Sequence, residues 1–371
     1  MSILVINAGS SSIKYSIYDS KTLKVIDHGL IEELASHHEG FDIMAKQLEQ
    51  HGIDITKIDA IGHRVVHGGE RFCDPVLIDD EVLREIEALI PLAPLHNPAN
   101  IEGILAACAI APNVPSFAIF DTAFHQTIPE HAYRYALPHD LYESYHIRRY
   151  GFHGTSHYYV SSQASLMLQK PLASLNLISF HIGNGVSACA IKQGKSIDTS
   201  MGMTPLEGLI MGTRSGSIDP AVIVYLMHKK KMTIEEIDVL LTKKSGLLAI
   251  TGTSDLRLII DAKEKGDTNA SLAIDMFTYT LKKQLGAYMA VLPSIDAIIF
   301  TGGIGEHSAL IRTMMCDELE HLGIKLDDEK NRTSMPQIQA QSSAIALLVI
   351  PTDEEYQIAL YVQQRICKLN Y

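Results

Sequence analysis

The sequence lacks the features that mark membrane-spanning and secreted proteins. No run approaches the ~20 consecutive apolar residues of a membrane span, and the apolar residues 3–6 are too few for the core of a signal peptide. The five cysteines are scattered, odd in number and never spaced C-x-x-C. This usage is typical of reduced thiols rather than of a disulfide or zinc framework. We therefore expect a cytoplasmic protein that has no contact with a membrane.

Positive charge is also scarce. The chain carries 31 Lys and Arg residues against 43 Asp and Glu residues, which gives a net charge of −12. A general nucleic-acid-binding surface would be basic, so no nucleic-acid partner is expected. An anionic small molecule would need cationic side chains gathered locally, because the overall field of the protein repels it.

Two familiar nucleotide-binding motifs are incomplete. Gly194-Lys195-Ser196 resembles the end of a Walker A loop, but Cys189 occupies the position of the upstream glycine. Residues 302–307 follow a strand-like run and resemble a dinucleotide fingerprint, but Ser308 stands at the third glycine position. A nicotinamide-dependent oxidoreductase built on this segment is therefore a weak alternative, although glycines at a helix start still let the backbone approach a nucleotide.

The length and two similar hairpins indicate two domains. The 371 residues exceed the ~250–300 at which a single core stops growing. Residues 3–6 and 13–18 have the pattern of two strands around a tight turn, and residues 177–182 and 186–191 repeat this arrangement. We predict an internal duplication in which each hairpin begins one α/β domain.

Strands and helices alternate in both halves of the sequence, which is typical of an α/β fold. Asn100, or the pair Asn97-Pro98, is expected to cap the helix that follows, and residues 133–150 are expected to cross the surface as a loop. The further strands are predicted at 60–66, 117–120, 297–300 and 347–350, and the helices at 40–52, 83–90, 101–110, 235–241, 270–292, 309–322 and 354–369.

The turn of the first hairpin suits a phosphate chain. It offers backbone N–H groups and the hydroxyls of Ser10 and Ser12, and Lys14 follows in the next strand. Gly9 can adopt the positive φ that such a turn often requires. Many serine-rich turns bind nothing, so the turn by itself leaves both interpretations open.

Charged and imidazole side chains follow the predicted strands of the first half, where α/β proteins bind ligands. Arg64 lies among glycines and is placed to hold a carboxylate or phosphate, although a surface arginine near a turn is the alternative. Asp121 directly follows the strand 117–120, a position typical of catalytic carboxylates and also of structural caps. His96 lies in a proline-bounded loop, where a purely structural histidine is the commoner case.

The second half adds an arginine and two histidines. His153 and His157 are spaced i, i+4, but the glutamate of the H-E-x-x-H zinc motif and a third ligand are missing, so zinc is disfavoured. His153, flanked by glycines, is better suited to donate to a phosphoryl oxygen. Arg214, together with Arg64, would supply two guanidinium groups for a transferring phosphoryl group. The carboxylates at 353–355 suit Mg²⁺ held through water, or simply an acidic helix start.

Long segments of the chain match one family in order. They are NAGSSSIKY, GHRVVHGGE, PLHNP, FDTAFHQ, YGFHGTSH, HIGNG, SMGMTPLEGL, MGTRSGSIDP, GGIGEH and IPTDEE. From Val5 to about Ala359 the sequence resembles the acetate and propionate kinase family. That family belongs to the actin, hexokinase and heat-shock-chaperone ATPase superfamily. The resemblance therefore implies two duplicated ribonuclease-H-like domains, each a mixed sheet flanked by helices, with ATP in the cleft between them.

The resemblance implies reversible transfer of a phosphoryl group from ATP to acetate, giving acetyl phosphate and ADP by direct in-line transfer. It implies Mg²⁺, with Mn²⁺ as an alternative ion, near Asn7 and Glu354. The implied catalytic residues are Asp121, Arg64, Arg214, His153 and His96, and the implied methyl pocket, next to Arg64, is Val66, Leu95, Phe152 and Pro205. The implied nucleotide site is Ser10, Ser12, Lys14, His181, Ile182, Gly183, Asn184, Gly185, Asp255, Leu256, Arg257, Gly303, Ile304, Gly305, Glu306 and His307.

We expect an N-terminal domain at 1–124, with a closing helix at 358–371 that packs back on it, and a C-terminal nucleotide-binding domain at 125–357. The family resemblance implies a homodimer. The chain departs from the family pattern in a shorter 25–60 segment and at Leu256 and His307, where an aromatic residue and an asparagine are usual. These departures concern adenine recognition and the choice of phosphate donor.

Two alternatives remain beside the oxidoreductase. A propionate or butyrate kinase would use the same chemistry in a roomier pocket; Val66 is bulky enough to disfavour longer chains, but one methylene changes binding by only ~1–3 kcal/mol. A non-catalytic nucleotide switch of the actin type would not need a carboxylate site, so the set that includes Arg64, Asp121 and Arg214 argues against it.

Overall fold

The computed structural model describes residues 2–9, 12–32, 36–94 and 96–369 of the chain. They belong to two compact units. Unit 1 comprises Met1–Gln126, Gly154–Ser156 and Asp353–Tyr371, and unit 2 comprises Thr127–His153 and His157–Thr352. The domain boundaries expected from the sequence, 1–124 with 358–371 and 125–357, stay a prediction.

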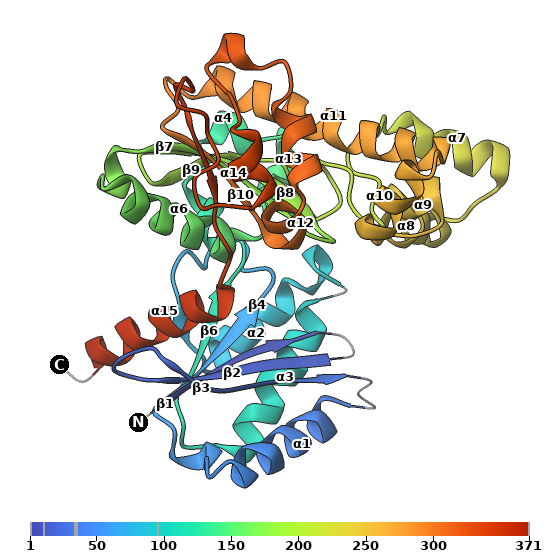
Figure 1. Cartoon of the computed structure of the whole chain (residues 1–371). Coiled ribbons are helices and arrows are strands. Elements are labelled where there is room, and N and C mark those ends of the chain that lie inside the picture. The colour runs from blue at the N-terminus through green and yellow to red at the C-terminus, as the bar shows by residue number, and fades with distance from the viewer. Residues whose placement is uncertain (1, 10–11, 33–35, 95, 370–371) are drawn as a thin grey trace. The chain divides into compact units, whose positions relative to one another are not determined.

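Unit 1 is built on a six-stranded mixed sheet with the strand order β3-β2-β1-β4-β6-β5 (Figure 1). β1, β2 and β3 are antiparallel neighbours, whereas β1, β4 and β6 run parallel. The strands are β1 (Ser2–Ala8), β2 (Ser12–Asp19), β3 (Val25–Glu32), β4 (Ala60–Val65), β5 (Val76–Leu77) and β6 (Ser116–Phe120). The helices are α1 (His37–Gln50), α2 (Asp80–Ala88), α3 (Asn97–Ile110) and, from the end of the chain, α15 (Glu354–Leu369).

Alternation along β1 gives unit 1 a core on each face of its sheet. Leu4 packs in a cluster with Phe41 of α1, while its neighbour Val5 packs in a different cluster with Ile358 of α15. Successive strand residues point to opposite faces, so a strand that is apolar at every position must be covered on both. The uninterrupted apolar run at the start of the sequence is explained by this double coverage.

Unit 2 contains a five-stranded mixed sheet with the order β11-β10-β7-β8-β9. β7, β8 and β9 form an antiparallel meander, and β7, β10 and β11 run parallel. Unit 1 has the same order of a three-stranded meander followed by two parallel strands. The internal duplication and the α/β class predicted from the two hairpins are therefore confirmed. The strands are β7 (Asn176–Ile182), β8 (Val186–Lys192), β9 (Lys195–Thr199), β10 (Ala297–Thr301) and β11 (Ala346–Val349).

Several helices of unit 2, among them α8, α10 and α11, begin at residues whose side chains cap the first turn. Thr233 begins α8 with a capping box: its hydroxyl accepts from the Glu236 N–H, and the Glu236 carboxylate accepts from the Thr233 N–H.

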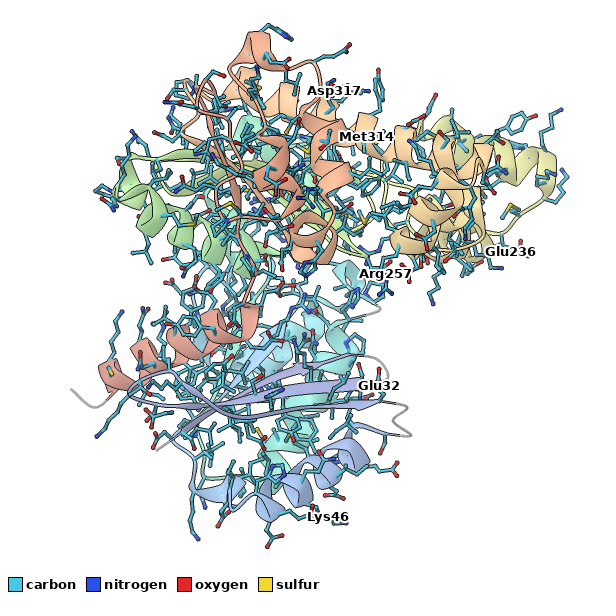
Figure 2. The ribbon with its side chains drawn as sticks, viewed as in Figure 1. Glu32, Lys46, Glu236, Arg257, Met314 and Asp317 are labelled. Atoms are coloured by element: carbon cyan, nitrogen blue, oxygen red, sulfur yellow. The ribbon has the colours of Figure 1, made fainter. Side chains whose placement is uncertain are left out.

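Exposed charges such as Lys46 on α1 and Glu236 on α8 project from the ribbon (Figure 2). In the described part of the chain, no helix has the length and apolar character to span a membrane.

The bounds of these helices follow the chain from α4 onward. They are α4 (Glu130–Tyr133), α5 (His139–Tyr145), α6 (Gly154–Leu168, which crosses the boundary between the units), α7 (Ala221–Lys230), α8 (Ile234–Lys243), α9 (Gly246–Thr251), α10 (Leu256–Glu264), α11 (Thr268–Val291), α12 (Gly302–His307), α13 (Ala309–Cys316) and α14 (Asp328–Arg332).

Three local predictions were wrong. His96, and neither Asn97 nor Asn100, is the N-cap of α3, because both amide side chains are hydrogen-bonded to strand-end backbone instead. The predicted loop 133–150 contains the short helix α5. The helix predicted at 309–322 ends at Cys316, since Glu318 adopts a left-handed φ of 59° that interrupts it.

Candidate functional site

In unit 1, three adjacent parallel strands bring Asn7, Arg64 and Asp121 to one edge of the sheet. Asn7 lies near the end of β1, Arg64 near the end of β4, and Asp121 directly after β6. Ligands of α/β proteins bind at this edge, where the carboxyl ends of the strands meet. The structure places these predicted residues together, while their roles stay predictions.

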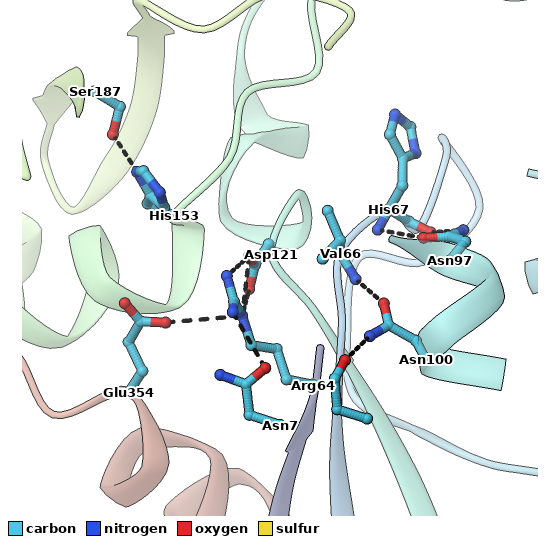
Figure 3. A network of polar contacts seen from close by, with 11 residues as sticks. Asn7, Arg64, Val66, His67, Asn97, Asn100, Asp121, His153, Ser187 and Glu354 are labelled. Carbon is cyan, nitrogen blue, oxygen red and sulfur yellow. Dashed lines mark hydrogen bonds and ion pairs between the residues drawn. The ribbon is translucent and has the colours of Figure 1, made fainter. Parts of the chain in front are cut away.

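Arg64 is the centre of a polar network (Figure 3). Its Nε donates to Asp121 Oδ1 at 3.0 Å, its Nη2 pairs with Asp121 Oδ2 at 2.5 Å, and its Nη1 donates to Asn7 Oδ1 at 3.3 Å. Glu354 Oε2, at the start of α15, lies 3.8 Å from Nε. The Asp121 side chain is only 2% exposed. Because both charges are largely withdrawn from water, each depends on the other for compensation.

Glu354 and Asn7 offer oxygen atoms of the kind that Mg²⁺ binds. Burial raises the pKa of Glu354, although the Arg64 guanidinium opposes the rise, and a cation beside this carboxylate would favour its ionised form. Mg²⁺ is usually held by one or two protein carboxylates together with substrate phosphates and water. Among the described residues, no group of three or more His, Cys, Asp or Glu side chains is arranged for a metal ion. These two residues therefore fit an ion that a bound nucleotide holds for the most part.

The strands of the first hairpin, β1 and β2, are paired as far as Ala8 and Ile13. The Gly9 N–H donates to the Ser12 carbonyl at 2.8 Å, and the Lys14 ammonium pairs with Glu355 Oε1 at 2.6 Å. Lys14 is thus held beside the acidic start of α15. Two predicted site residues, Ser10 and Leu95, lie outside the described residues.

Two buried asparagines, Asn97 and Asn100, which the sequence predicted as helix caps, fix the strand ends that carry this network. Asn100 Oδ1 accepts from the Val66 N–H at 3.0 Å, and its Nδ2 donates to the Ala8 carbonyl at 2.9 Å. Asn97 both accepts from and donates to the backbone of His67. These bonds join the end of β4 to the end of β1 (Figure 3), and so set the spacing between the residues that each strand presents.

In unit 2, His153 and Arg214 approach the turn between β7 and β8. The His153 ring stacks on His181 with centroids 4.2 Å apart, and its Nδ1 forms a hydrogen bond with Ser187 Oγ at 2.9 Å. A Cβ on Gly185 would lie 3.4 Å from His153 Nε2 and 3.6 Å from Arg214 Nη1. The glycine therefore leaves space between an imidazole and a guanidinium group.

His157, the partner in the disfavoured zinc pair, is fully buried among serines. Its Nδ1 and Nε2 form hydrogen bonds with Ser179 Oγ at 2.6 Å and Ser187 Oγ at 2.8 Å. Both ring nitrogens are thus engaged, and Ser187 connects His157 to His153. Ser187 was missed in the sequence because an inward-facing serine in an apolar strand has no distinctive pattern.

Arg214, unlike Arg64, has no carboxylate partner in the part of the chain that the structure describes. Its Nη1 donates to the Pro205 carbonyl at 2.9 Å, and among the described residues no Asp or Glu forms an ion pair with it. Burial lowers the pKa of Arg214, with no neighbouring anion to oppose the change. A guanidinium in this condition gains most from an anionic ligand.

A cavity of about 460 Å³ in unit 2 gathers many of the predicted nucleotide residues. Asp255 at its edge is the N-cap of α10, and hydrogen bonds from Arg257 lower the pKa of Asp255 to about 2. Arg257 itself extends into solvent (Figure 2). The cavity is lined by Gly183, Asn184, Ser254, Asp255, Leu256, Arg257, Ile260, Gly303, Ile304, His307 and Ser308.

Several predicted residues support this cavity without lining it. Gly302 has a φ of 75°, and a Cβ there would meet the backbone of Ile182, so the start of α12 packs directly on the end of β7. The Gly305 carbonyl accepts from Arg312, and Glu306 Oε1 accepts from the Thr352 N–H at 3.1 Å. These residues shape the backbone around the cavity.

The remaining predicted residues are apolar or lie at element starts. Phe152 is 2% exposed and Val66 is 9% exposed, while Pro205 and His96 are partly buried. The methyl pocket expected from the sequence stays a prediction.

Comparison with known proteins gives a consistent result. A family model described as the acetokinase family matches residues 31–360. An acetate kinase from Sulfurovum sp. (strain NBC37-1) is 48% identical over 396 aligned residues that cover the whole of both chains.

Solved structures agree over the whole chain. A propionate kinase from Francisella tularensis subsp. tularensis SCHU S4 has a TM-score of 0.93 at 43% identity and covers 97% of this chain and 98% of its own. Acetate kinase from Porphyromonas gingivalis has a TM-score of 0.93 at 41% identity and covers 99% of both chains. With the matching strand orders of the two sheets, these similarities confirm the fold of two duplicated ribonuclease-H-like α/β domains.

The two arginines should differ in their effect on stability. Arg64→Ala leaves the buried Asp121 carboxylate uncompensated and should lower the free energy of unfolding by roughly 3–5 kcal/mol. Arg214→Ala strands no anion, so its free energy of unfolding should stay within about 1 kcal/mol of the wild type. Arg257→Ala, at an 89% exposed side chain, is the control and should cost at most ~1 kcal/mol. Urea denaturation measures all three, and equal losses for Arg64→Ala and Arg214→Ala would contradict the assignment.

Proposed function

The chain belongs to the acetokinase family, and we propose that it catalyses reversible, Mg²⁺-dependent transfer of the γ-phosphoryl group of ATP to acetate, giving acetyl phosphate and ADP. The observation that carries this proposal is Arg214, a partly buried guanidinium without an anionic partner among the described residues, close to His153. Such a pair suits a substrate that brings negative charge with it, as a carboxylate and a phosphoryl group both do.

The chemistry requires no general base. Acetate is already ionised near neutral pH, since carboxyl groups titrate near pH 4. One acetate oxygen attacks the γ-phosphorus and forms a new O–P bond, while the bond to the β,γ-bridging oxygen breaks and ADP leaves with the electron pair. The protein positions the two substrates in line and neutralises charge. We assign charge neutralisation to Arg64, Arg214 and His153, and orientation of Arg64 to Asp121.

We assign the Mg²⁺ site to Asn7 and Glu354, with Mn²⁺ as an alternative ion. Both side chains have an oxygen atom that faces Arg64 and could ligate a metal ion. Burial raises the pKa of Glu354, so a bound cation would stabilise its ionised form. When bound, the ion would neutralise negative charge on the phosphate chain. The hairpin residues Ser10, Ser12 and Lys14 are proposed to face the same phosphates.

We assign the nucleotide to the 460 Å³ cavity. Leu256 supplies an apolar wall at the position where relatives commonly have an aromatic residue, and His307 offers an imidazole where asparagine is usual. Both line the cavity, so these two positions are where this chain would differ in adenine recognition.

We propose that two copies associate and act in the cytoplasm, where ATP is present. Helix α7 supports the association. None of its residues is buried within the chain. Its apolar side chains Val222, Val224 and Tyr225 are 41%, 55% and 62% exposed. A helix that is apolar and still uncovered is typical of a protein interface. Sedimentation of the whole chain tests this, and a monomer at every concentration would contradict it.

The substrate is tested by kcat/KM for acyl phosphate formation with Mg-ATP across formate, acetate, propionate and butyrate. We expect a peak at acetate, because Val66 narrows the proposed methyl pocket. Val66→Ala should move the preference towards propionate by about tenfold, the effect of one methylene.

Each outcome of that series has a defined meaning. A wild-type peak at propionate or butyrate would keep the mechanism and change the substrate, in line with the name of the Francisella relative. Absence of turnover with every carboxylate would favour a nucleotide switch. Calorimetric binding of NAD would favour the oxidoreductase.

The metal assignment is tested by the concentration of Mg²⁺ needed for half-maximal activity. Removal of Mg²⁺ by a chelator should abolish turnover. Glu354→Gln should raise the required concentration about tenfold or more, a loss of about 1.4 kcal/mol in binding. Glu81→Gln is the matched control, because that carboxylate of the same unit is 61% exposed and paired with Arg71. An unchanged Mg²⁺ requirement in Glu354→Gln would exclude this ligand.

A further inference from the structure

A second polar cluster lies in unit 2, on residues that the proposed mechanism does not use. It consists of Tyr135, Arg149 and Glu207, and we refer to it as the Glu207 cluster. Tyr135 Oη donates to Glu207 Oε2 at 2.5 Å, and Arg149 Nη2 pairs with Glu207 Oε1 at 2.7 Å. Both carboxylate oxygens are therefore occupied, and burial raises the pKa of Tyr135, with Glu207 adding to the rise.

The Glu207 cluster holds the backbone of segment 199–207. Arg149 Nη1 donates to three successive carbonyls, those of Thr199, Ser200 and Met201, at 3.1, 3.3 and 3.1 Å. The Tyr135 hydroxyl also accepts from the Met203 N–H at 3.0 Å. The Arg149 guanidinium and the Tyr135 hydroxyl thus hold the backbone of residues 199–203, which precede Pro205 in the chain.

Close packing restricts the same segment further. A Cβ at Gly202 would collide with the Glu207 carboxylate and the Tyr135 hydroxyl, so only glycine lets the backbone lie this close to the cluster. The Gly202 carbonyl also accepts from the Tyr150 and Gly151 N–H groups at 3.0 and 3.2 Å.

The far side of Pro205 is fixed as well. Glu207 is held by Tyr135 and Arg149. The next residue, Gly208, forms two hydrogen bonds with Ser217. The Ser217 N–H donates to the Gly208 carbonyl at 2.9 Å, and the Gly208 N–H donates to Ser217 Oγ at 3.0 Å. The backbone on both sides of Pro205 is therefore held in place by hydrogen bonds.

Pro205 in turn orients Arg214. Its carbonyl accepts from Arg214 Nη1 at 2.9 Å, and Met211 Sδ is the other acceptor, at 3.4 Å. No carboxylate of the described residues pairs with Arg214, so its direction depends on these neutral acceptors. A shift of Pro205 would move the guanidinium with it.

We propose that the Glu207 cluster positions Arg214 for phosphoryl transfer through the Pro205 carbonyl. Tyr135, Arg149 and Glu207 are positioning residues in this account, which rests on the proposed function. The cluster is partly buried, with the Glu207 side chain 34% exposed. A misplacement of a reacting or stabilising group by about 1 Å can cost as much as 10²-fold in rate.

A double-mutant cycle between Glu207→Gln and Arg214→Ala tests the inference. In the wild-type background, Glu207→Gln should lower kcat about tenfold or more, while KM for ATP stays unchanged, because Glu207 does not line the nucleotide cavity. In the Arg214→Ala background, Glu207→Gln should have no further effect, because the group that it positions is gone. Tyr135→Phe, a milder change, should behave in the same way.

Tyr142→Phe is the matched control. It removes a hydroxyl from the same part of the chain, where Tyr142 faces Tyr133 at 3.4 Å, and should leave kcat at the wild-type value. The inference would be overturned if Glu207→Gln lowered kcat by the same factor with Arg214 present and with Arg214 replaced by alanine. If Glu207→Gln does not fold, the same comparison is made with Tyr135→Phe. That result would leave an active wild type and the proposed function intact, whereas a wild type inactive with every carboxylate would overturn the proposed function itself.

Discussion

Burial of a guanidinium group requires compensation, and the two arginines of the candidate site obtain it differently. Arg64 is held by the Asp121 carboxylate, with Glu354 nearby. Among the described residues, the acceptors of Arg214 are neutral: the Pro205 carbonyl and Met211 Sδ. The first arrangement builds a rigid site at the strand ends. The second keeps a partly buried cation that no carboxylate of the described residues balances, and the proposed phosphoryl transfer depends on that difference.

The duplicated sheets explain how such groups come to be held at all. In unit 1 the parallel strands β1, β4 and β6 end together and present Asn7, Arg64 and Asp121 at one edge. In unit 2 the turn between β7 and β8 and the start of α12 after β10 shape the cavity that we propose for the nucleotide. Polar side chains that are buried, such as Asn100, then tie neighbouring strand ends to each other. The sheets place the functional residues at the strand ends, and the buried amide side chains fix the distance between neighbouring strand ends.

Much of this arrangement could be predicted from the sequence, because its signals are local. Continuous apolar runs marked β1, β7 and β10, and Asp121 stood directly after such a run. Asn100 was misread as a helix cap, since a sequence shows its neighbour along the chain and not the β1 carbonyl that it binds. The Glu207 cluster was missed for the same reason: Tyr135 lay in an expected loop, and its partner Glu207 is distant in sequence. Long-range polar contacts have no periodicity by which to recognise them.

The measurement that tests the account most directly is kcat for acetyl phosphate formation by Arg214→Ala, with acetate and Mg-ATP at saturation. If the Arg214 guanidinium binds the anionic substrates, kcat should fall by about 10²–10³, the effect of losing one preorganised donor. Arg214→Lys, which keeps the charge and loses the planar fork, should recover only part of the rate. A rate close to that of the wild type in Arg214→Ala would contradict the account.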